Sequence, residues 1–308
     1  MKATVLSGGV GGARFLRGIL AVTDPGNVAI VGNVADDIEV LGLHVSPDLD
    51  SVLYALAGLA DEQRGWGRAG ETWNALSTAE EFGHDAWFRL GDRDLGLHLV
   101  RTELLRSGLP LSVVTAKLVA AVGLSCALLP ATDDPLRTFL ETPAGTFPFQ
   151  EWFVGRGHRD EVDAVHYAGA PAARPAPGVV DAIEGADVLV LAPSNPYVSI
   201  GPILAVDAIR SALERRTVPC VAISPLIGGR AVKGPADRML ERLAGGTTPA
   251  HLAGYYGGLI DVLVIDQADA SAELPDGVRV VVTQTLMMGD DARRRLATAV
   301  LDAASAPT

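Results

Sequence analysis

Two short polar segments near the amino terminus combine residue types that can bind phosphate and a metal ion. The first is a glycine-rich turn, Ser7-Gly8-Gly9-Val10-Gly11-Gly12-Ala13-Arg14. The second is an acidic stretch with four carboxylates, Asp36, Asp37, Asp48 and Asp50, and little positive charge among them. Carboxylates gathered in this way need a cation or a cationic partner. A phosphate site beside a divalent-metal site is therefore the leading interpretation.

The glycine turn follows an apolar run at 3–6 and precedes an apolar helical pattern at 15–22. In a strand, glycine loop and helix arrangement, backbone amides and the helix N-terminus can receive a phosphate. The glycines at 8, 9, 11 and 12 fit neither the dinucleotide fingerprint nor a Walker loop. A second hypothesis stays open, in which they only let the first helix pack closely on the sheet.

The four aspartates also have a structural alternative, because Asp is a common helix N-cap and loop residue. Their density between positions 36 and 50, beside a strand end, favours a site. We predict that Asp36, Asp37, Asp48 and Asp50 hold Mg²⁺. Either Asp50 or Asp48 could accept a proton from a reacting hydroxyl, and Asp50 is the first choice.

The elements that would position these residues alternate between strand and helix. Short apolar runs ending in polar turns predict strands at 3–6, 28–34, 126–129, 186–191, 220–224, 262–265 and 278–283, and a weaker one at 147–154. Helical spacing predicts helices at 51–59, 71–81, 95–107, 111–122 and 290–304. We expect an α/β fold, Rossmann-like and doubly wound, with a mostly parallel sheet. Residues 1–55 and 124–308 would form its nucleotide-binding core, and 56–123 an inserted small helical subdomain.

Two turns after later strands are polar and rigid. Ser194, Asn195 and Ser199 follow one strand, and Ser224 and Gly228 follow the next. Ligands of parallel sheets bind at the carboxyl ends of the strands, so these turns should face the glycine loop and bind a base, ribose or phosphate. Arg230 and Lys233 could add positive charge there. The alternative is that these residues only form tight turns and caps.

A third group of residues lies in the predicted helical insertion. Asp94, His98 and Arg101 have helical spacing and should share one face. Arg93 could clamp a phosphate or carboxylate through two parallel hydrogen bonds, which Lys cannot do as well. A purely structural ion network is the alternative.

Composition excludes several classes of protein. The 308 residues carry a net charge of −12 and no basic run, which argues against a broad nucleic-acid interface. No apolar run reaches the roughly 18–20 residues of a membrane-spanning helix. Met1-Lys2 leads directly into the first predicted strand, without a signal peptide, and we expect a cytoplasmic protein. The two cysteines, Cys126 and Cys220, make no metal pattern and are expected to be buried and reduced.

Eight segments in order along nearly the whole chain resemble the 2-phospho-L-lactate transferases, which act in coenzyme F420 biosynthesis. They are the segments at 7–14, 46–50 (Ser-Pro-Asp-Leu-Asp), 90–95 (Leu-Gly-Asp-Arg-Asp-Leu), 128–134, 149–154 (Phe-Gln-Glu-Trp-Phe-Val), 193–203, 224–229 (Ser-Pro-Leu-Ile-Gly-Gly) and 285–287. Overall similarity leans to the actinobacterial phosphoenolpyruvate type. The sequence leaves open which three-carbon phosphoester the donor carries.

The resemblance implies transfer of a phosphoenolpyruvyl or 2-phospho-L-lactyl group from a guanosine diphosphate-linked donor, with GMP released and Mg²⁺ assisting. The acceptor is 7,8-didemethyl-8-hydroxy-5-deazariboflavin, and the product is dehydro-coenzyme F420-0 or coenzyme F420-0. Asp50 and Arg93 match positions associated with this deazaflavin. The glycine loop and the Ser194-Asn195 turn match the nucleotide side. Relatives form dimers, so a homodimer is expected, with Tyr255 and Tyr256 at the interface or Tyr255 at the nucleotide pocket.

Two rival hypotheses remain in view. One is a non-catalytic, nucleotide-binding or regulatory protein of the same fold, against which the Gly91-Asp92-Arg93-Asp94 segment argues. The other is a doubly wound oxidoreductase, whose glycine fingerprint is absent. A shift in the absorbance or fluorescence of free deazaflavin on mixing would indicate acceptor binding.

Overall fold

The centre of the molecule is a parallel sheet of seven strands. In the computed structural model, which describes residues 1–306, the strand order is β14-β13-β10-β9-β1-β2-β5. The strands are β1 (Ala3–Ser7), β2 (Val28–Gly32), β5 (Ala127–Pro130), β9 (Val188–Leu191), β10 (Cys220–Ile223), β13 (Val262–Asp266) and β14 (Arg279–Thr283). The chain first builds outward from β1 through β2 to β5, and then from β9 to β14 on the other side. The order therefore reverses beside β1, which is where doubly wound sheets bind ligands.

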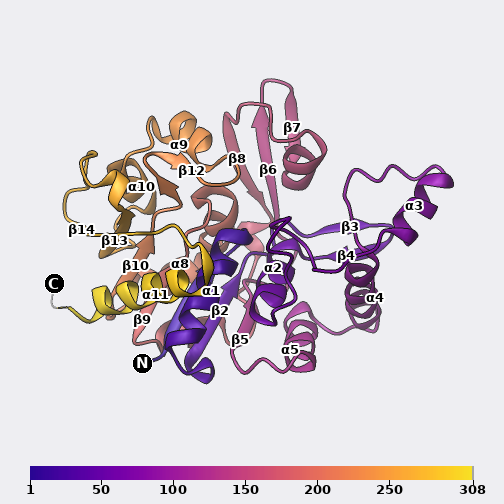
Figure 1. The fold of residues 1–308 in the computed structure, drawn as a ribbon, viewed down its shortest axis with the longest axis horizontal. Coiled ribbons are helices and arrows are strands. Elements are labelled where there is room, and N and C mark those ends of the chain that lie inside the picture. The colour runs from indigo at the N-terminus through magenta and orange to yellow at the C-terminus, as the bar shows by residue number, and fades with distance from the viewer. Residues whose placement is uncertain (307–308) are drawn as a thin grey trace.

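Helices cover both faces of this sheet, as Figure 1 shows. One core packs α1, α2, α5 and α11 on the sheet, and the other packs α6, α8, α9 and α10. The helices are α1 (Gly9–Val22), α2 (Pro47–Leu56), α3 (Asn74–Glu81), α4 (Asp92–Arg106), α5 (Leu111–Ala121), α6 (Val179–Glu184), α7 (Gly201–Leu204), α8 (Asp207–Glu214), α9 (Ala236–Ala244), α10 (Pro249–Tyr256) and α11 (Gly289–Ser305). The parallel sheet with helices on both faces confirms the predicted Rossmann-like α/β class. Strands buried on both faces are continuously apolar, which is the pattern that the sequence shows.

Residues 56–123 include α3, α4 and α5, which lie to one side of the sheet in Figure 1. A hairpin, β3 (Ile38–Val40) with β4 (Leu43–Val45), packs against this part through Val40, Val45 and Leu90. The hairpin was not predicted from the sequence, because its strands are only three residues long. The boundaries of an inserted subdomain stay a prediction.

The predicted strand at 147–154 is wrong. The structure has an antiparallel sheet in the order β7-β6-β8, with β6 (Arg137–Thr142), β7 (Gly145–Pro148) and β8 (Ala164–Ala168). After β7 the chain turns into a π-helical segment, Glu151–Gly155. Phe149, Trp152 and Phe153 have helical rather than alternating spacing, and their rings pack together. The spacing of the aromatic residues therefore indicates a helical turn and not a strand.

The structure also bears on the expectations for the cysteines, for a membrane span and for the two tyrosines. Cys126 and Cys220 are free and buried, as expected. No helix within residues 1–306 is long and apolar enough to cross a membrane.

Tyr256 is only 1% exposed inside the protomer, so its predicted place at a dimer interface is wrong. Tyr255 does not line the cavity at the carboxyl ends of the strands, which was its other predicted place. Its hydroxyl donates to the carbonyl of Pro196 (2.9 Å) and stabilises the turn after β9. The homodimer itself stays a prediction.

The close crossing of α1 and α11 predicts which helical glycine the fold requires. A Cβ on Gly18 would lie 2.2 Å from the carbonyl oxygen of Arg293, whereas a Cβ on Gly96 in α4 would meet nothing within 4 Å. Gly18→Ala should lower the free energy of unfolding by about 1–3 kcal/mol, because two backbones must separate. Gly96→Ala should leave it unchanged or raise it by up to about 1 kcal/mol. Urea unfolding would measure both, and equal effects would contradict this packing.

Candidate active site

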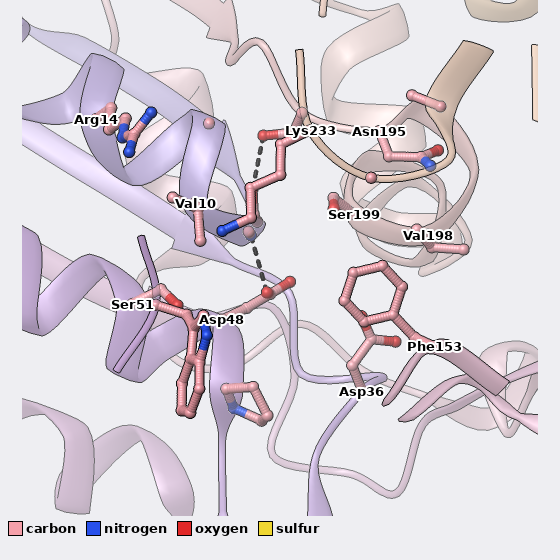
Figure 2. Close-up of a pocket in the computed structure, with 18 of the residues that line it drawn as sticks. Val10, Arg14, Asp36, Asp48, Ser51, Phe153, Asn195, Val198, Ser199 and Lys233 are labelled. Atoms are coloured by element: carbon pink, nitrogen blue, oxygen red, sulfur yellow. Dashed lines mark hydrogen bonds between the residues drawn. The ribbon is translucent and has the colours of Figure 1, made fainter. Parts of the chain in front are cut away.

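A cavity of about 750 Å³ opens at the carboxyl ends of the central strands. The turns after β1, β2, β9 and β10 all reach it, together with α2, α4, the 149–154 segment and residues 285–288. Figure 2 shows Asp36, Asp48, Ser199 and Lys233 placed around this space by different elements. The fold therefore brings most of the predicted site residues to one place.

The glycine turn forms the start of α1, which begins at Gly9 and not at Phe15 as predicted. The amide of Gly9 donates to Asp48 Oδ1 (2.8 Å), so this helix N-terminus already binds a carboxylate. A Cβ on Gly8 would lie 2.5 Å from Asp48 Oδ2, and one on Gly11 would lie 2.5 Å from the carbonyl of Pro193. Close approach is thus a requirement of this turn. Gly8, Gly9 and Gly11 also line the cavity, and phosphate binding by this turn stays a prediction.

Gly12 has a packing role. It does not line the cavity, and a Cβ there would lie 2.2 Å from Ser7 Oγ and 2.7 Å from Ser194 Oγ. Ser194 in turn donates through its hydroxyl to the carbonyl of Gly8 (2.7 Å). Gly12 therefore lets α1 approach the turn after β9, which binds the glycine turn directly.

Asn33 connects two of the four aspartates. Its side-chain amide donates to Asp36 Oδ2 (3.0 Å), Asp48 Oδ2 (2.9 Å) and the carbonyl of Val198 (3.2 Å). The Asn33 side-chain oxygen accepts from the amide of Ala35 (2.9 Å), which fixes the orientation of the group. One buried, neutral side chain therefore holds two carboxylates side by side.

The environment of this pair opposes negative charge. Burial, followed by the negative charge of Asp48, raises the pKa of Asp36 well above its usual range. Burial raises the pKa of Asp48 to about 6, against the hydrogen bonds from Asn33 and Gly9. Asp36 Oδ1 is buried and has no hydrogen-bond partner among the described residues. A cation between the two carboxylates would relieve these penalties.

The other two aspartates point elsewhere. Asp37 Oδ2 accepts from Ser46 Oγ (2.8 Å) and pairs with His44 Nε2 (2.9 Å), and Asp37 does not line the cavity. Asp50 does line it, but both its oxygens bind the Arg101 guanidinium, one of them at 3.0 Å from Nη1. Within residues 1–306 no three His, Cys, Asp or Glu side chains are close enough to hold one metal ion. The four aspartates are thus divided into a pair and two separately bound groups.

The predicted shared face of α4 is present beneath the cavity. Asp94, His98 and Arg101 are all buried, and Tyr54 donates its hydroxyl to Asp94 Oδ1. His98 Nδ1 lies 3.8 Å from Asp50 Oδ2, and burial lowers the pKa of His98 to about 4. Burial also raises the pKa of Asp94 to about 6. Burial therefore favours the neutral form of His98, and Arg101 fixes the position of Asp50.

Arg93 lies on the other side of α4. It is exposed, does not line the cavity, and its guanidinium approaches the carbonyl of Ala69 at 3.5 Å. The structure assigns the fork-to-carboxylate pairing to Arg101, two turns further along the helix. An acceptor-binding role for Arg93 stays a prediction.

Some residues of the polar turns after β9 and β10 line the cavity and others do not. Ser194, Asn195, Ser199 and Ser224 line the cavity, whereas Gly228 does not. Asn195 Oδ1 also accepts from the amide of Tyr197 (2.9 Å), as a cap would. The amide of Gly228 donates to Asp269 Oδ2 (3.0 Å), and Arg230 is exposed near Asp237 (3.9 Å) at a different groove.

Several cavity residues were missed by sequence reasoning. Tyr54 lies four residues after Asp50 on α2, a helical spacing that could have revealed it. Asn33, which is buried and does not itself line the cavity, was also missed, because its bridging role depends on a contact with residue 48. The aromatic residues that line the cavity gave no signal of their own; they are Trp66, Trp87, Phe88, Phe149 and Phe153.

Comparison with known proteins decides the family. Residues 3–303 match the model of the 2-phospho-L-lactate transferase family (CofD). The chain belongs to this family. A phosphoenolpyruvate transferase of Streptomyces griseus is 42% identical over 313 residues, covering 99% of this chain and 98% of the relative. The corresponding values for phosphoenolpyruvate transferases of Thermobifida fusca and Mycolicibacterium smegmatis are 40% over 318 residues and 39% over 325 residues, with at least 98% of each chain covered.

Solved structures support the fold of the family. A UPF0052 protein from Bacillus halodurans superposes with a TM-score of 0.64 at 19% identity, covering 98% of this chain and 100% of that one. At this identity the likeness concerns the fold alone. The resemblance seen in the eight sequence segments is confirmed by the family match, which spans them.

The buried Arg101–Asp50 pair predicts a large asymmetry between single and double substitutions. Arg101→Met should lower the free energy of unfolding by about 3–5 kcal/mol, because it leaves Asp50 buried without its cation. Asp50→Asn combined with Arg101→Met should recover most of this loss. Chemical unfolding of the three proteins gives the comparison. A double variant no more stable than Arg101→Met would show that the pair is not the source of the stability.

Proposed function

We propose that this chain transfers a phosphoenolpyruvyl group from a guanosine diphosphate-linked donor to a hydroxyl of 7,8-didemethyl-8-hydroxy-5-deazariboflavin, releasing GMP. A 2-phospho-L-lactyl group is the second candidate. Membership of the transferase family supports the reaction class, and the names of the relatives favour phosphoenolpyruvate. The observation that carries the proposal is the composition of the cavity, whose polar and aromatic side chains suit the two substrates.

Polar and aromatic side chains both line the cavity. Asp36, Asp48, Ser194 and Ser199 lie around the start of α1, where a diphosphate and its cation would bind. The aromatic side chains of Trp66, Trp87, Phe88, Phe149 and Phe153 come from other segments that reach the same space. A flat ring system such as a deazaflavin would bury its faces against them. A reaction between these two substrates needs both kinds of surface in one cavity.

The carboxylate pair fits Mg²⁺ better than the four-aspartate set does. Mg²⁺ usually binds through one or two carboxylates plus water and substrate phosphate oxygens. Asp36 and Asp48 meet this need, and the unpartnered Asp36 Oδ1 offers a ligand atom. Asp37 and Asp50 are bound to His44 and Arg101 and would stay outside this shell. Bound Mg²⁺ would neutralise charge on the phosphate oxygens.

The residues of the chain would act by positioning and by proton transfer. Phosphoryl-type transfer needs an in-line hydroxyl and charge neutralisation more than a covalent nucleophile. Arg101 fixes the orientation of Asp50, which lines the cavity and would accept a hydrogen bond from the acceptor hydroxyl. Asp50 is therefore the first candidate to receive its proton. Asp48, with a pKa of about 6, is the second.

A product assay tests the reaction and the identity of the transferred group. The purified protein is mixed with Mg²⁺, the deazaflavin and one donor at a time. The reaction should form a phosphodiester of the deazaflavin and release GMP, and mass spectrometry detects both products. The enolpyruvyl product is lighter than the lactyl product by two hydrogens, and we expect the lighter one from the preferred donor. Absence of any product, with deazaflavin still bound, would favour the non-catalytic protein of the same fold.

Metal binding predicts a pH-dependent thermal shift. Millimolar MgCl₂ should raise the melting temperature at pH 7.5, because a ligand that binds only the folded state stabilises it. Protons compete below the pKa of about 6 for Asp48, so the shift should shrink at pH 5. Asp36→Asn should remove it at both pH values, while Asp37→Asn should retain it. An undiminished shift in Asp36→Asn would place the ion elsewhere.

A further inference from the structure

Two cationic side chains meet at the mouth of the cavity. Arg14 lies on α1, and Lys233 lies between β12 (Arg230–Ala231) and α9. Both converge on Gly65, where a Cβ would lie 2.9 Å from Lys233 Nζ and 3.8 Å from Arg14 Nη2. Lys233 Nζ donates to the carbonyl of Gly65 (3.0 Å). Figure 2 shows both side chains beside the cavity, with Asp48 also facing it.

Neither cation has a carboxylate partner among residues 1–306 within the 4.0 Å of an ion pair. Arg17, three residues after Arg14 on the same helix, shows the contrast, because it pairs with Asp290 (3.0 Å) and Glu62. Partial burial and the positive charge of Arg14 lower the pKa of Lys233. Two like charges held together repel, so this arrangement is suited to an anion that binds both.

The backbone amides of the glycine turn do not take the place of Arg14 and Lys233 in binding an anion. The amide of Gly9 is occupied by Asp48, and Gly12 is committed to packing. The α1 N-terminus therefore offers fewer free donors to a phosphate than its sequence indicated. Positive charge for a diphosphate must come from a bound metal ion and from side chains.

We propose that Arg14 and Lys233 together bind the diphosphate of the donor, on the side opposite Asp36 and Asp48; this rests on the proposed function. A guanidinium fork and an ammonium group suit phosphate oxygens on adjacent phosphorus atoms. In the transfer, the acceptor oxygen forms a bond to the phosphorus of the three-carbon phosphate. The bond from that phosphorus to the bridging oxygen breaks, and its electrons leave with GMP. The hydroxyl proton goes to a carboxylate, and the two cations stabilise the charge gained by GMP.

Inorganic pyrophosphate is the probe, because its binding does not depend on recognition of the nucleoside. Isothermal titration at fixed Mg²⁺ would compare the wild type with Arg14→Gln, Lys233→Gln and Arg230→Gln. We expect each of the first two to weaken binding by at least about tenfold, as loss of a charge-assisted contact does. Arg230→Gln removes the same charge from an exposed residue at another groove and should change affinity less than about twofold. Lys233→Arg should retain most of the affinity.

A structural role would show itself in stability. Removing either cation relieves repulsion, so the melting temperature of Arg14→Gln should not fall by more than about 2 °C. Wild-type affinity in Arg14→Gln and Lys233→Gln, or no pyrophosphate binding by the wild type, would overturn the proposal. The product assay tests the proposed reaction separately. If Arg14 and Lys233 bind pyrophosphate but the protein forms no product, only the proposed reaction is refuted.

Discussion

One amide group holds the candidate site together. The side chain of Asn33, at the end of β2, donates to Asp36, to Asp48 on α2 and to the carbonyl of Val198 in the turn after β9. Asp48 in turn accepts from the first amide of α1. Four segments that follow different strands are thereby fixed to one another by two buried side chains, Asn33 and Asp48. Because two carboxylates share one neutral donor, this arrangement is incomplete without positive charge.

The rest of the cavity places charge and apolar surface around that pair. Arg14 and Lys233 line the cavity and have no anionic partner in the described part of the chain, residues 1–306, and Asp50 is held separately by the buried guanidinium of Arg101. The separation has a chemical consequence. A carboxylate bound by arginine is oriented for a hydroxyl, while a pair strained by burial and mutual repulsion is prepared for a cation. The aromatic residues complete a space in which a diphosphate and a ring system could meet.

The sequence predicted the sheet well because each central strand is buried on both faces and therefore reads as an unbroken apolar run. Val188–Leu191 and Val262–Asp266 are examples. The prediction of a strand at 147–154 failed because three aromatic residues at helical spacing also approximate an alternating pattern over a few positions. The three-residue strands of the β3–β4 hairpin are too short to give any periodic signal.

The site could be predicted only as a collection of residue types. Composition and spacing located the aspartates, but their division depends on partners distant in the chain, such as Arg101 for Asp50. The glycines were recognised, yet only coordinates show that Gly12 packs against Ser7 while Gly9 binds Asp48. Lys233 was noted as a local charge, and its meeting with Arg14 at Gly65 could not be inferred without the fold. Pattern gives the chemistry available, and long-range packing decides which groups use it.

The most direct test of this account is anomalous diffraction from crystals soaked with Mn²⁺ and pyrophosphate. We predict one strong manganese peak in contact with Asp36 and Asp48, with pyrophosphate oxygens bound by Arg14 and Lys233. Asp37 and Asp50 should retain their contacts with His44 and Arg101. A manganese peak on Asp37 or Asp50 instead, or pyrophosphate bound away from both cations, would contradict the account.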